Sequence, residues 1–184
     1  EYGDAVSPVR VKEALAAEPA TRGVFVQASE SSTGAAHDVR AMGAAVAETE
    51  AIFVVDAITA LGVFDIKTDA WGLDVVITGS QKALMLPPGM AFVSVSDKAW
   101  ALADKAKNAA FYFNFKKERE NQVKNQTAYT PTVSLIIGLQ EAFKIMKGEG
   151  LEKMFSRQGR LAHAMREGAL VEKVANTVMR IEKL

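Results

Sequence analysis

The chain alternates short, continuous apolar runs with longer segments in which apolar residues recur at helical spacing. The short runs are typical of buried strands, and the longer segments are typical of amphipathic helices. Strand, helix and strand follow one another early in the chain, which predicts a right-handed crossover and a parallel pair. The pattern therefore predicts an α/β fold with a mostly parallel sheet flanked by helices. Strands are predicted at 23–28, 51–55, 74–78 and 90–95, and helices at 8–18, 38–50, 97–110, 133–146 and 150–165.

Weaker patterns lead to more detailed expectations. No helical pattern separates the last two predicted strands, so we expect these two to pair in the antiparallel direction. Residues 63–66 alternate weakly and predict a short strand, and Asp97 is expected to cap the helix that it begins. Residues 111–115 form an aromatic cluster, for which packing of a lid or a subunit contact is favoured over stacking on a ligand. Spaced valine and isoleucine residues within 171–181 predict one more helix.

The composition is that of an ordinary globular protein. The chain has 184 residues, of which 49% are hydrophobic and 24% charged, and its formal net charge is zero. This balance gives no reason to expect nucleic acid or a membrane surface as a partner, and no apolar run reaches membrane-spanning length. Cysteine is absent, so no disulfide framework and no thiolate metal site are expected, and we assign no residue to a metal. We expect a cytoplasmic location, since the lack of cysteine fits a reducing compartment. The chain begins at Glu1 without a signal-peptide pattern, and we expect it to be a fragment.

The loop between the last two predicted strands holds the first candidate for chemistry. Lys82 lies near its start, four apolar residues follow, and the loop ends in Pro87-Pro88-Gly89. An ammonium group in apolar surroundings is costly unless it is paired or converted to a less charged form. Imine formation with an aldehyde is one such conversion, and it makes lysine a nucleophilic catalyst. A solvated lysine at a strand end is the alternative, because most lysines are exposed.

A carboxylate makes the catalytic interpretation stronger. Asp56 ends the apolar run 51–55, as expected for a buried parallel strand with an acid at its carboxyl end. Ligands bind at that edge of open α/β sheets, where Lys82 is also expected. A carboxylate can keep a pyridine nitrogen protonated, and a lysine can carry pyridoxal phosphate as a Schiff base. The Asp56 carboxylate and the Lys82 amine are therefore the two groups that a protein contributes to pyridoxal phosphate chemistry.

Three stretches together are similar to one protein family. They are Glu30-Ser31-Ser32-Thr33-Gly34, the run Val55-Asp56-Ala57-Ile58-Thr59-Ala60-Leu61-Gly62, and Gly79-Ser80-Gln81-Lys82-Ala83-Leu84 with Pro87-Pro88-Gly89. In order and spacing they resemble the class V aminotransferases, in particular the alanine–glyoxylate and serine–pyruvate group. The resemblance extends from the N-terminus to about Gly168. It implies that residues 1–147 are part of the large cofactor-binding domain and that residues 148–184 are a connecting helix with a remnant of the small C-terminal domain.

The resemblance also implies an activity. It implies transamination between a small amino acid, serine or alanine, and a 2-oxo acid, glyoxylate or pyruvate, with pyridoxal 5′-phosphate as cofactor. It further implies a homodimer in which the active site is shared between subunits. By position, Lys82 matches the Schiff-base lysine, which also moves the proton of the reaction. Asp56 matches the partner of the pyridine nitrogen.

Further residues match cofactor contacts of the same family. Ile58 matches a small apolar residue beneath the ring, Ser31 a residue beside the ring substituents, and Gln81 a neighbour of the phosphate. Thr130 matches a phosphate contact made across the subunit boundary, with Thr127 as a weaker candidate. Hydroxyls and free amides at a helix start suit such an anion. Simple capping of the following helix by Thr130 is the alternative.

The chain also departs from the family pattern. Neither a GxGxxG nor a GxxxxGK[ST] phosphate motif occurs, and no arginine can be assigned to the substrate carboxylate. Arg180 is the late candidate, and we interpret it as a surface residue. Two other interpretations therefore stay open: a class V enzyme of another reaction, such as a desulfurase or lyase, or a non-catalytic fragment with part of the fold. The desulfurase needs a nucleophilic cysteine, which this chain lacks.

Overall fold

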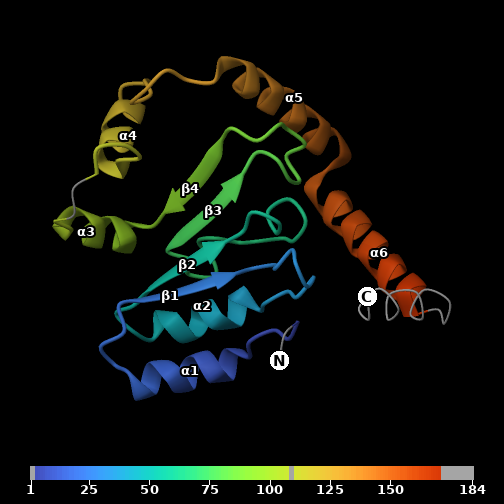
Figure 1. The fold of residues 1–184 in the computed structure, drawn as a ribbon, viewed down its shortest axis with the longest axis horizontal. Coiled ribbons are helices and arrows are strands. Elements are labelled where there is room, and N and C mark those ends of the chain that lie inside the picture. Colours follow the sequence, from blue (N-terminus) through green and yellow to red (C-terminus); the bar gives the residue numbers. More distant parts are fainter. Residues whose placement is uncertain (1–2, 108–109, 171–184) are drawn as a thin grey trace, which may run out of the picture.

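A computed structural model describes residues 3–107 and 110–170 of the chain (Figure 1). Its centre is a four-stranded sheet with the strand order β1-β2-β3-β4. The first three strands are parallel, and β4 runs antiparallel to β3. The predicted α/β fold, the mostly parallel sheet and the antiparallel last pair are all confirmed. The strands are β1 Gly23–Gln27, β2 Ile52–Asp56, β3 Val75–Gly79 and β4 Ala91–Val95.

Six helices occur in the described residues, and they lie on two sides of the sheet. Figure 1 shows α1 and α2 next to β1 and β2, whereas α3 to α6 follow one another in an arc around the other side. None of the helices within residues 3–107 and 110–170 is both long and apolar enough to cross a membrane. The predicted helix within 171–181, and Arg180 with it, falls outside the described residues. The helices are α1 Pro8–Ala17, α2 Val39–Ala47, α3 Asp97–Lys105, α4 Phe115–Gln122, α5 Val133–Glu149 and α6 Leu151–Leu170.

Short polar side chains set where several helices begin. Asp38 caps α2, because its carboxylate accepts a hydrogen bond from the Ala41 N–H at 2.9 Å. The expectation that Asp97 caps α3 is wrong, because Ser96 is the cap and its hydroxyl accepts from the Ala99 N–H at 3.1 Å. The capping role considered for Thr130 is also wrong. The residue at the start of α5 is Thr132, and its side chain makes no capping hydrogen bond.

The short strand predicted at 63–66 is not formed. Val63 and Phe64 both donate their N–H groups to the carbonyl of Ala60, which closes a turn after Asp56. Only an isolated bridge joins Leu61 to Phe64. Gly62, directly before this segment, has a left-handed φ of 79°, a conformation that interrupts an extended strand and that glycine adopts without strain.

The main core lies between the sheet and α1 and α2. Val55 of β2 pairs with Val26 of β1 and Val76 of β3, so these side chains share the face on which the helices pack. The opposite face is more open, and Phe25 on β1 keeps 75% of its surface exposed. The buried members of the core are Leu15, Ala28, Val39, Met42, Val46, Ala51, Phe53, Val55, Ala57, Ala60, Leu73 and Val76.

A second, smaller cluster connects the loop after β3 to the two long helices. Leu84 from this loop is buried with Met146 of α5 and Met154 of α6. Phe92 of β4 packs against the same group. The loop that contains Lys82 is therefore anchored by apolar contacts to helices far along the chain.

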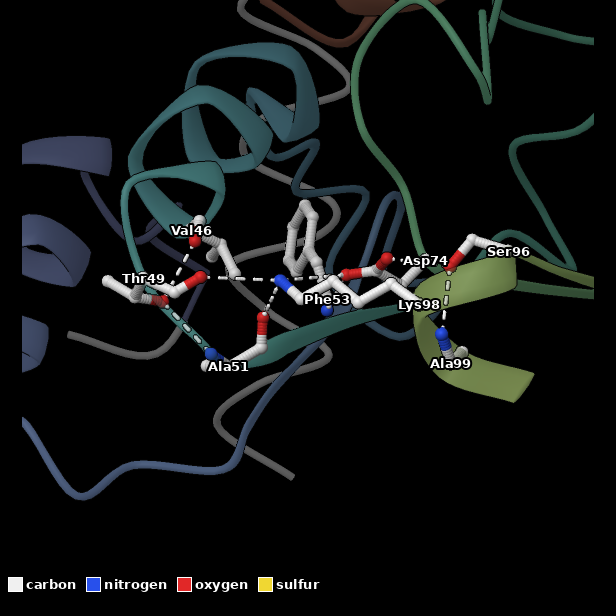
Figure 2. A network of polar contacts seen from close by, with 8 residues as sticks. All are labelled: Val46, Thr49, Ala51, Phe53, Asp74, Ser96, Lys98 and Ala99. Carbon is white, nitrogen blue, oxygen red and sulfur yellow. Dashed lines mark hydrogen bonds and ion pairs between the residues drawn. The ribbon is translucent and has the colours of Figure 1, made fainter. Parts of the chain in front are cut away.

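A buried carboxylate joins β2, β3 and α3 at the sheet edge opposite the predicted site (Figure 2). Asp74, at the start of β3, accepts hydrogen bonds from the Phe53 N–H at 2.9 Å and the Ser96 hydroxyl at 2.7 Å. The Lys98 ammonium lies 3.7 Å from the same carboxylate and also donates to the Ala51 carbonyl. Because every polar group of this network has a partner, the network stabilises the junction of the three elements.

Replacing Asp74 by alanine should lower the stability of the fold. The change leaves the buried Phe53 N–H without an acceptor and Lys98 without its charge partner. Because Lys98 is partly solvated, water offsets part of the lost ion pair. We expect the free energy of unfolding to fall by about 2–3 kcal/mol in urea titrations. Asp97→Ala is the matched control, since Asp97 is an exposed carboxylate one residue beyond Ser96. Equal stability of the two variants would contradict the role assigned to the network.

Candidate active site

Three loops leave the same edge of the sheet. Gln27 at the end of β1 pairs with Asp56 at the end of β2, and Asp56 pairs with Ile77 of β3. Because these strands are parallel, their carboxyl ends lie side by side, which Figure 1 shows on the side toward α6. This is the edge where open α/β sheets bind ligands. The structure thus brings the loops that hold Ser31 and Lys82 next to Asp56.

Asp56 is the last residue of β2, and its position is fixed by hydrogen bonds. Its backbone carbonyl accepts from the Ala28 N–H at 2.8 Å, and its Oδ1 accepts from the Ile58 N–H at 2.9 Å. The residue is half-buried, and so is Ile58. Among the described residues, none donates a hydrogen bond to the second carboxylate oxygen of Asp56. One oxygen therefore orients the group, while the other can accept from a ligand.

Lys82 lies in the loop after β3, and its side chain is exposed. The expectation of apolar surroundings is therefore wrong, because the apolar neighbours turn elsewhere: Leu84 packs between α5 and α6. Within the described part of the chain, no acceptor lies within hydrogen-bonding or ion-pairing distance of the Lys82 ammonium. The amine is thus accessible to a carbonyl compound at the sheet edge.

Gln81 precedes the lysine and turns back over the end of β3. A Cβ added to Gly79 would lie 2.7 Å from the Gln81 Oε1, so the glycine leaves room for the amide. The Gln81 side chain remains exposed. Its amide is therefore placed at the carboxyl end of β3, beside the Lys82 loop.

Ser80 is a structural residue of this site that the sequence did not reveal. It is fully buried, and its hydroxyl donates to the Pro87 carbonyl at 2.8 Å and accepts from the Met90 N–H at 3.2 Å. Its backbone carbonyl accepts from the Leu86 N–H at 3.1 Å. These bonds close the base of the lysine loop. A serine in a polar stretch carries no sequence signal that distinguishes such a buried role from an exposed one.

The loop after β1 is folded tightly around Ser31. The Glu30 N–H donates to the Ala35 carbonyl, and the Gly34 N–H donates back to the Glu30 carbonyl, each at 2.8 Å. Hydrogen bonds from Ser32, the backbone N–H first and the hydroxyl second, lower the pKa of Glu30, with a smaller contribution from the Ser31 N–H. Ser31 itself is exposed at the tip of the loop.

The loops after β1 and β2 are also joined directly. The Thr59 hydroxyl donates to the Ser29 carbonyl at 2.7 Å. Thr59 lies three residues beyond Asp56, and Ser29 lies two residues before Ser31, so this bond fixes the two candidate loops relative to each other. In the sequence, nothing distinguishes the Thr59 hydroxyl from a solvent-exposed group, and only the fold shows that it bridges two loops.

Thr130 lies apart from these loops. It is exposed and lines a pocket of about 550 Å³ beside β4, together with Tyr112 from the aromatic cluster 111–115 and its own neighbour Tyr129. The rings of Tyr112 and Tyr129 meet edge to face with their centroids 4.8 Å apart. The structure therefore places Thr130 on the β4 side of the molecule, and its predicted contact across a subunit boundary stays a prediction.

The family model described as aminotransferase class-V matches residues 6–177. The chain belongs to the class V aminotransferase family. It is 41% identical over 169 residues to the soluble hydrogenase 42 kDa subunit of Anabaena cylindrica, covering 90% of this chain and 44% of that protein. It is 33% identical over 176 residues to the serine–glyoxylate aminotransferase of Methylorubrum extorquens, covering 91% of this chain and 44% of that protein.

Solved structures agree with this assignment. The fold matches the pyridoxamine–pyruvate aminotransferase of Mesorhizobium loti with a TM-score of 0.85 and 30% identity, covering 91% of this chain and 44% of that chain. This class V aminotransferase chain therefore spans less than half the length of the relatives it matches. Membership of the family indicates pyridoxal phosphate as the cofactor.

The donor set at the sheet edge fits this cofactor. Asp56 offers a half-buried carboxylate with one oxygen available, which suits a protonated pyridine nitrogen. Lys82 offers an accessible amine on the neighbouring loop, which suits an aldehyde carbon. Within residues 3–107 and 110–170, no group of three or more histidine or acidic side chains could hold a metal ion.

Proposed function

We propose that the protein carrying this chain transfers an amino group from serine or alanine to a 2-oxo acid, glyoxylate or pyruvate. The observation that carries the proposal is the placement of Asp56 and the Lys82 loop at the carboxyl ends of adjacent parallel strands in a class V chain. The name of the Methylorubrum extorquens relative supports a serine donor and a glyoxylate acceptor.

Each residue of the pair has a distinct role in this proposal. When bound, pyridoxal phosphate supplies a ring that delocalises the negative charge arising on the substrate carbon. Lys82 attaches the cofactor through its amine and, once the amino substrate displaces it, moves the proton to and from the substrate carbon. Asp56 holds a proton on the pyridine nitrogen by hydrogen bonding and by its charge. Its bond from the Ile58 N–H keeps the carboxylate in a fixed orientation.

Other residues are proposed to position the cofactor. Ile58 packs under the ring, Ser31 contacts the ring substituents, and Gln81 lies near the phosphate. Thr130 contacts the phosphate bound by a second subunit, which makes a homodimer with a shared active site part of the proposal. The exposure of Thr130 leaves its hydroxyl available for such a contact. Residues 1–147 then belong to the large domain, and residues 148–184 connect it to the small one.

The experiment that tests the reaction uses the protein supplied with pyridoxal phosphate. L-serine and L-alanine are each combined with an acceptor that differs from their own keto product, and amino acids, 2-oxo acids and ammonia are quantified. Transamination conserves the amino group, so we expect equimolar new amino acid and new 2-oxo acid without ammonia. Ammonia release without an acceptor would indicate a lyase, and sulfide from added cysteine a desulfurase. Either result, or turnover no faster than with free cofactor, would contradict the proposal.

A further inference from the structure

The loop after Asp56 and the loop of Lys82 touch at two small residues. Gly62 lies in the first loop, and Ala83 directly follows Lys82 in the second. A Cβ added to Gly62 would lie only 2.9 Å from the Cβ of Ala83, closer than real Cβ atoms approach. The absence of a side chain at position 62 therefore allows the two loops to approach this closely.

Both loops are held firmly on either side of this contact. In the first loop, the Ala57 N–H donates to the Ile77 carbonyl of β3 and the Leu61 N–H donates to the Ala57 carbonyl, each at 2.8 Å. In the second loop, the buried Ser80 hydroxyl bonds to the far end of the loop, and Leu84 is buried against α5 and α6. Neither loop can shift freely. Volume added at this contact is therefore accommodated only by displacing one of the two loops from its bonded position.

The contact differs from the other glycine contacts of the lysine loop. A Cβ on Gly89 or Gly138 would meet the end of a leucine side chain, at 2.7 Å from Leu135 Cδ1 and at 2.8 Å from Leu86 Cδ2, respectively. A leucine end can rotate away at little cost. The Ala83 Cβ cannot, because it is bonded directly to the backbone beside Lys82. Added volume at position 62 therefore acts on the backbone that carries the lysine.

We propose that Gly62 is a positioning residue whose contact with Ala83 sets the place of Lys82 relative to Asp56. The inference rests on the proposed function, in which Lys82 and Asp56 act on the same bound cofactor. A methyl group at position 62 displaces one of the two loops and so changes the position of the Lys82 amine relative to the Asp56 carboxylate. Removing the methyl group at position 83 restores the space.

The test is an exchange of the methyl group between the two positions. The variants are Gly62→Ala, Ala83→Gly and the double variant Gly62→Ala/Ala83→Gly. Gly72→Ala is the matched control, because Gly72 also has a left-handed φ, 64° against 79° for Gly62, but no atom lies within 4 Å of its added Cβ. The control carries the backbone strain of alanine at such a position without the steric contact.

Two measurements are made on each full-length variant. The first is the rate at which borohydride fixes the pyridoxyl group of added pyridoxal phosphate on the peptide that contains Lys82. The second needs no cofactor: hydrogen exchange of the Met85 and Leu86 amides, which donate to the Lys82 and Ser80 carbonyls. We expect Gly62→Ala to slow labelling about tenfold or more and to speed exchange. The double variant should return both toward the original values, within about threefold.

The outcomes separate this inference from the proposed function. The inference is overturned if the double variant shows the same labelling rate at Lys82 and the same amide hydrogen exchange as Gly62→Ala. It is also overturned if Gly72→Ala slows labelling as much as Gly62→Ala does. If the original chain fixes no pyridoxyl group on Lys82, the proposed function and the positioning role both fail, whereas exchange still decides the contact. If only the amide hydrogen exchange of the double variant recovers, the result would support the steric contact between positions 62 and 83 and reject its role in positioning Lys82 for the reaction.

Discussion

Alanine in place of Lys82 should abolish turnover, to less than about a thousandth of the original rate. The amine is the group proposed to attach the cofactor and to move the substrate proton, and no other lysine lies in the loops after β1 and β3 at this edge. Borohydride should no longer fix a pyridoxyl group on the peptide 80–90. Because the Lys82 side chain is exposed and makes no hydrogen bond or ion pair with a described residue, its loss should leave thermal stability unchanged.

Lys153→Ala is the matched control for this experiment. Lys153 is an exposed lysine on α6 whose side chain makes no hydrogen bond or ion pair with a described residue, so its removal changes the charge by the same amount outside the proposed site. We expect full turnover and full labelling of Lys82 in this variant. A Lys82→Ala protein that keeps its activity, or that is fixed by borohydride at another lysine with normal turnover, would refute the assignment of Lys82.

Alanine in place of Asp56 should reduce the rate far more than it reduces cofactor binding. Without the carboxylate the pyridine nitrogen loses its proton, and the ring accepts less of the charge that develops on the substrate carbon. We expect turnover to fall by about 100-fold or more, while binding of pyridoxal phosphate falls by a smaller factor. The measurement is turnover at saturating cofactor, together with cofactor affinity from absorbance titration.

Two further variants separate charge from structure at Asp56. Asp56→Asn keeps an oxygen that can accept from the Ile58 N–H but removes the negative charge, so it should be nearly as slow as alanine. Asp69→Ala removes an exposed carboxylate from the connection between β2 and β3 and should leave turnover unchanged. Normal turnover in Asp56→Asn would remove the charge of Asp56 from the mechanism.

The positions of Asp56 and Lys82 at one edge follow from patterns that the sequence contains. Continuous apolar runs predict buried strands, and the helix between the first two implies a parallel crossover. The structure confirms that β1 and β2 are parallel and that β4 is antiparallel to β3. These rules are local or topological, and they place both loops at the carboxyl ends of their strands without knowledge of side-chain contacts.

Other features of the site could not be predicted because they depend on contacts between distant segments. The surroundings of Lys82 are set by Leu84, which packs against Met146 and Met154 more than 60 positions later and leaves the lysine exposed. Likewise, Ser80 is buried only because the loop closes onto Pro87 and Met90. No periodicity in the sequence encodes which of several polar side chains becomes enclosed.

Local competition explains the smaller errors. Ser96 and Asp97 are both good helix caps, and Ser96 is the cap, with its hydroxyl also hydrogen-bonded to the buried Asp74 carboxylate. Residues 63–66 alternate weakly, but the left-handed Gly62 and the bonds to the Ala60 carbonyl favour a turn. The bond to Asp74 comes from a distant segment and accompanies the choice of Ser96, whereas the turn at 63–66 is formed by local bonds that a weak alternation does not reveal.

The sequence by itself determined the class of fold, the order of the strands and of every described helix except α4, and the residue types that resemble class V aminotransferases. Apolar periodicity and strand–helix–strand order suffice for this, because both are properties of neighbouring residues. Only the tertiary structure decided that Lys82 is exposed, that Ser80 closes its loop and that Gly62 meets Ala83. Those facts arise from close packing between segments far apart in the chain, where differences of less than an ångström determine which side chains fit.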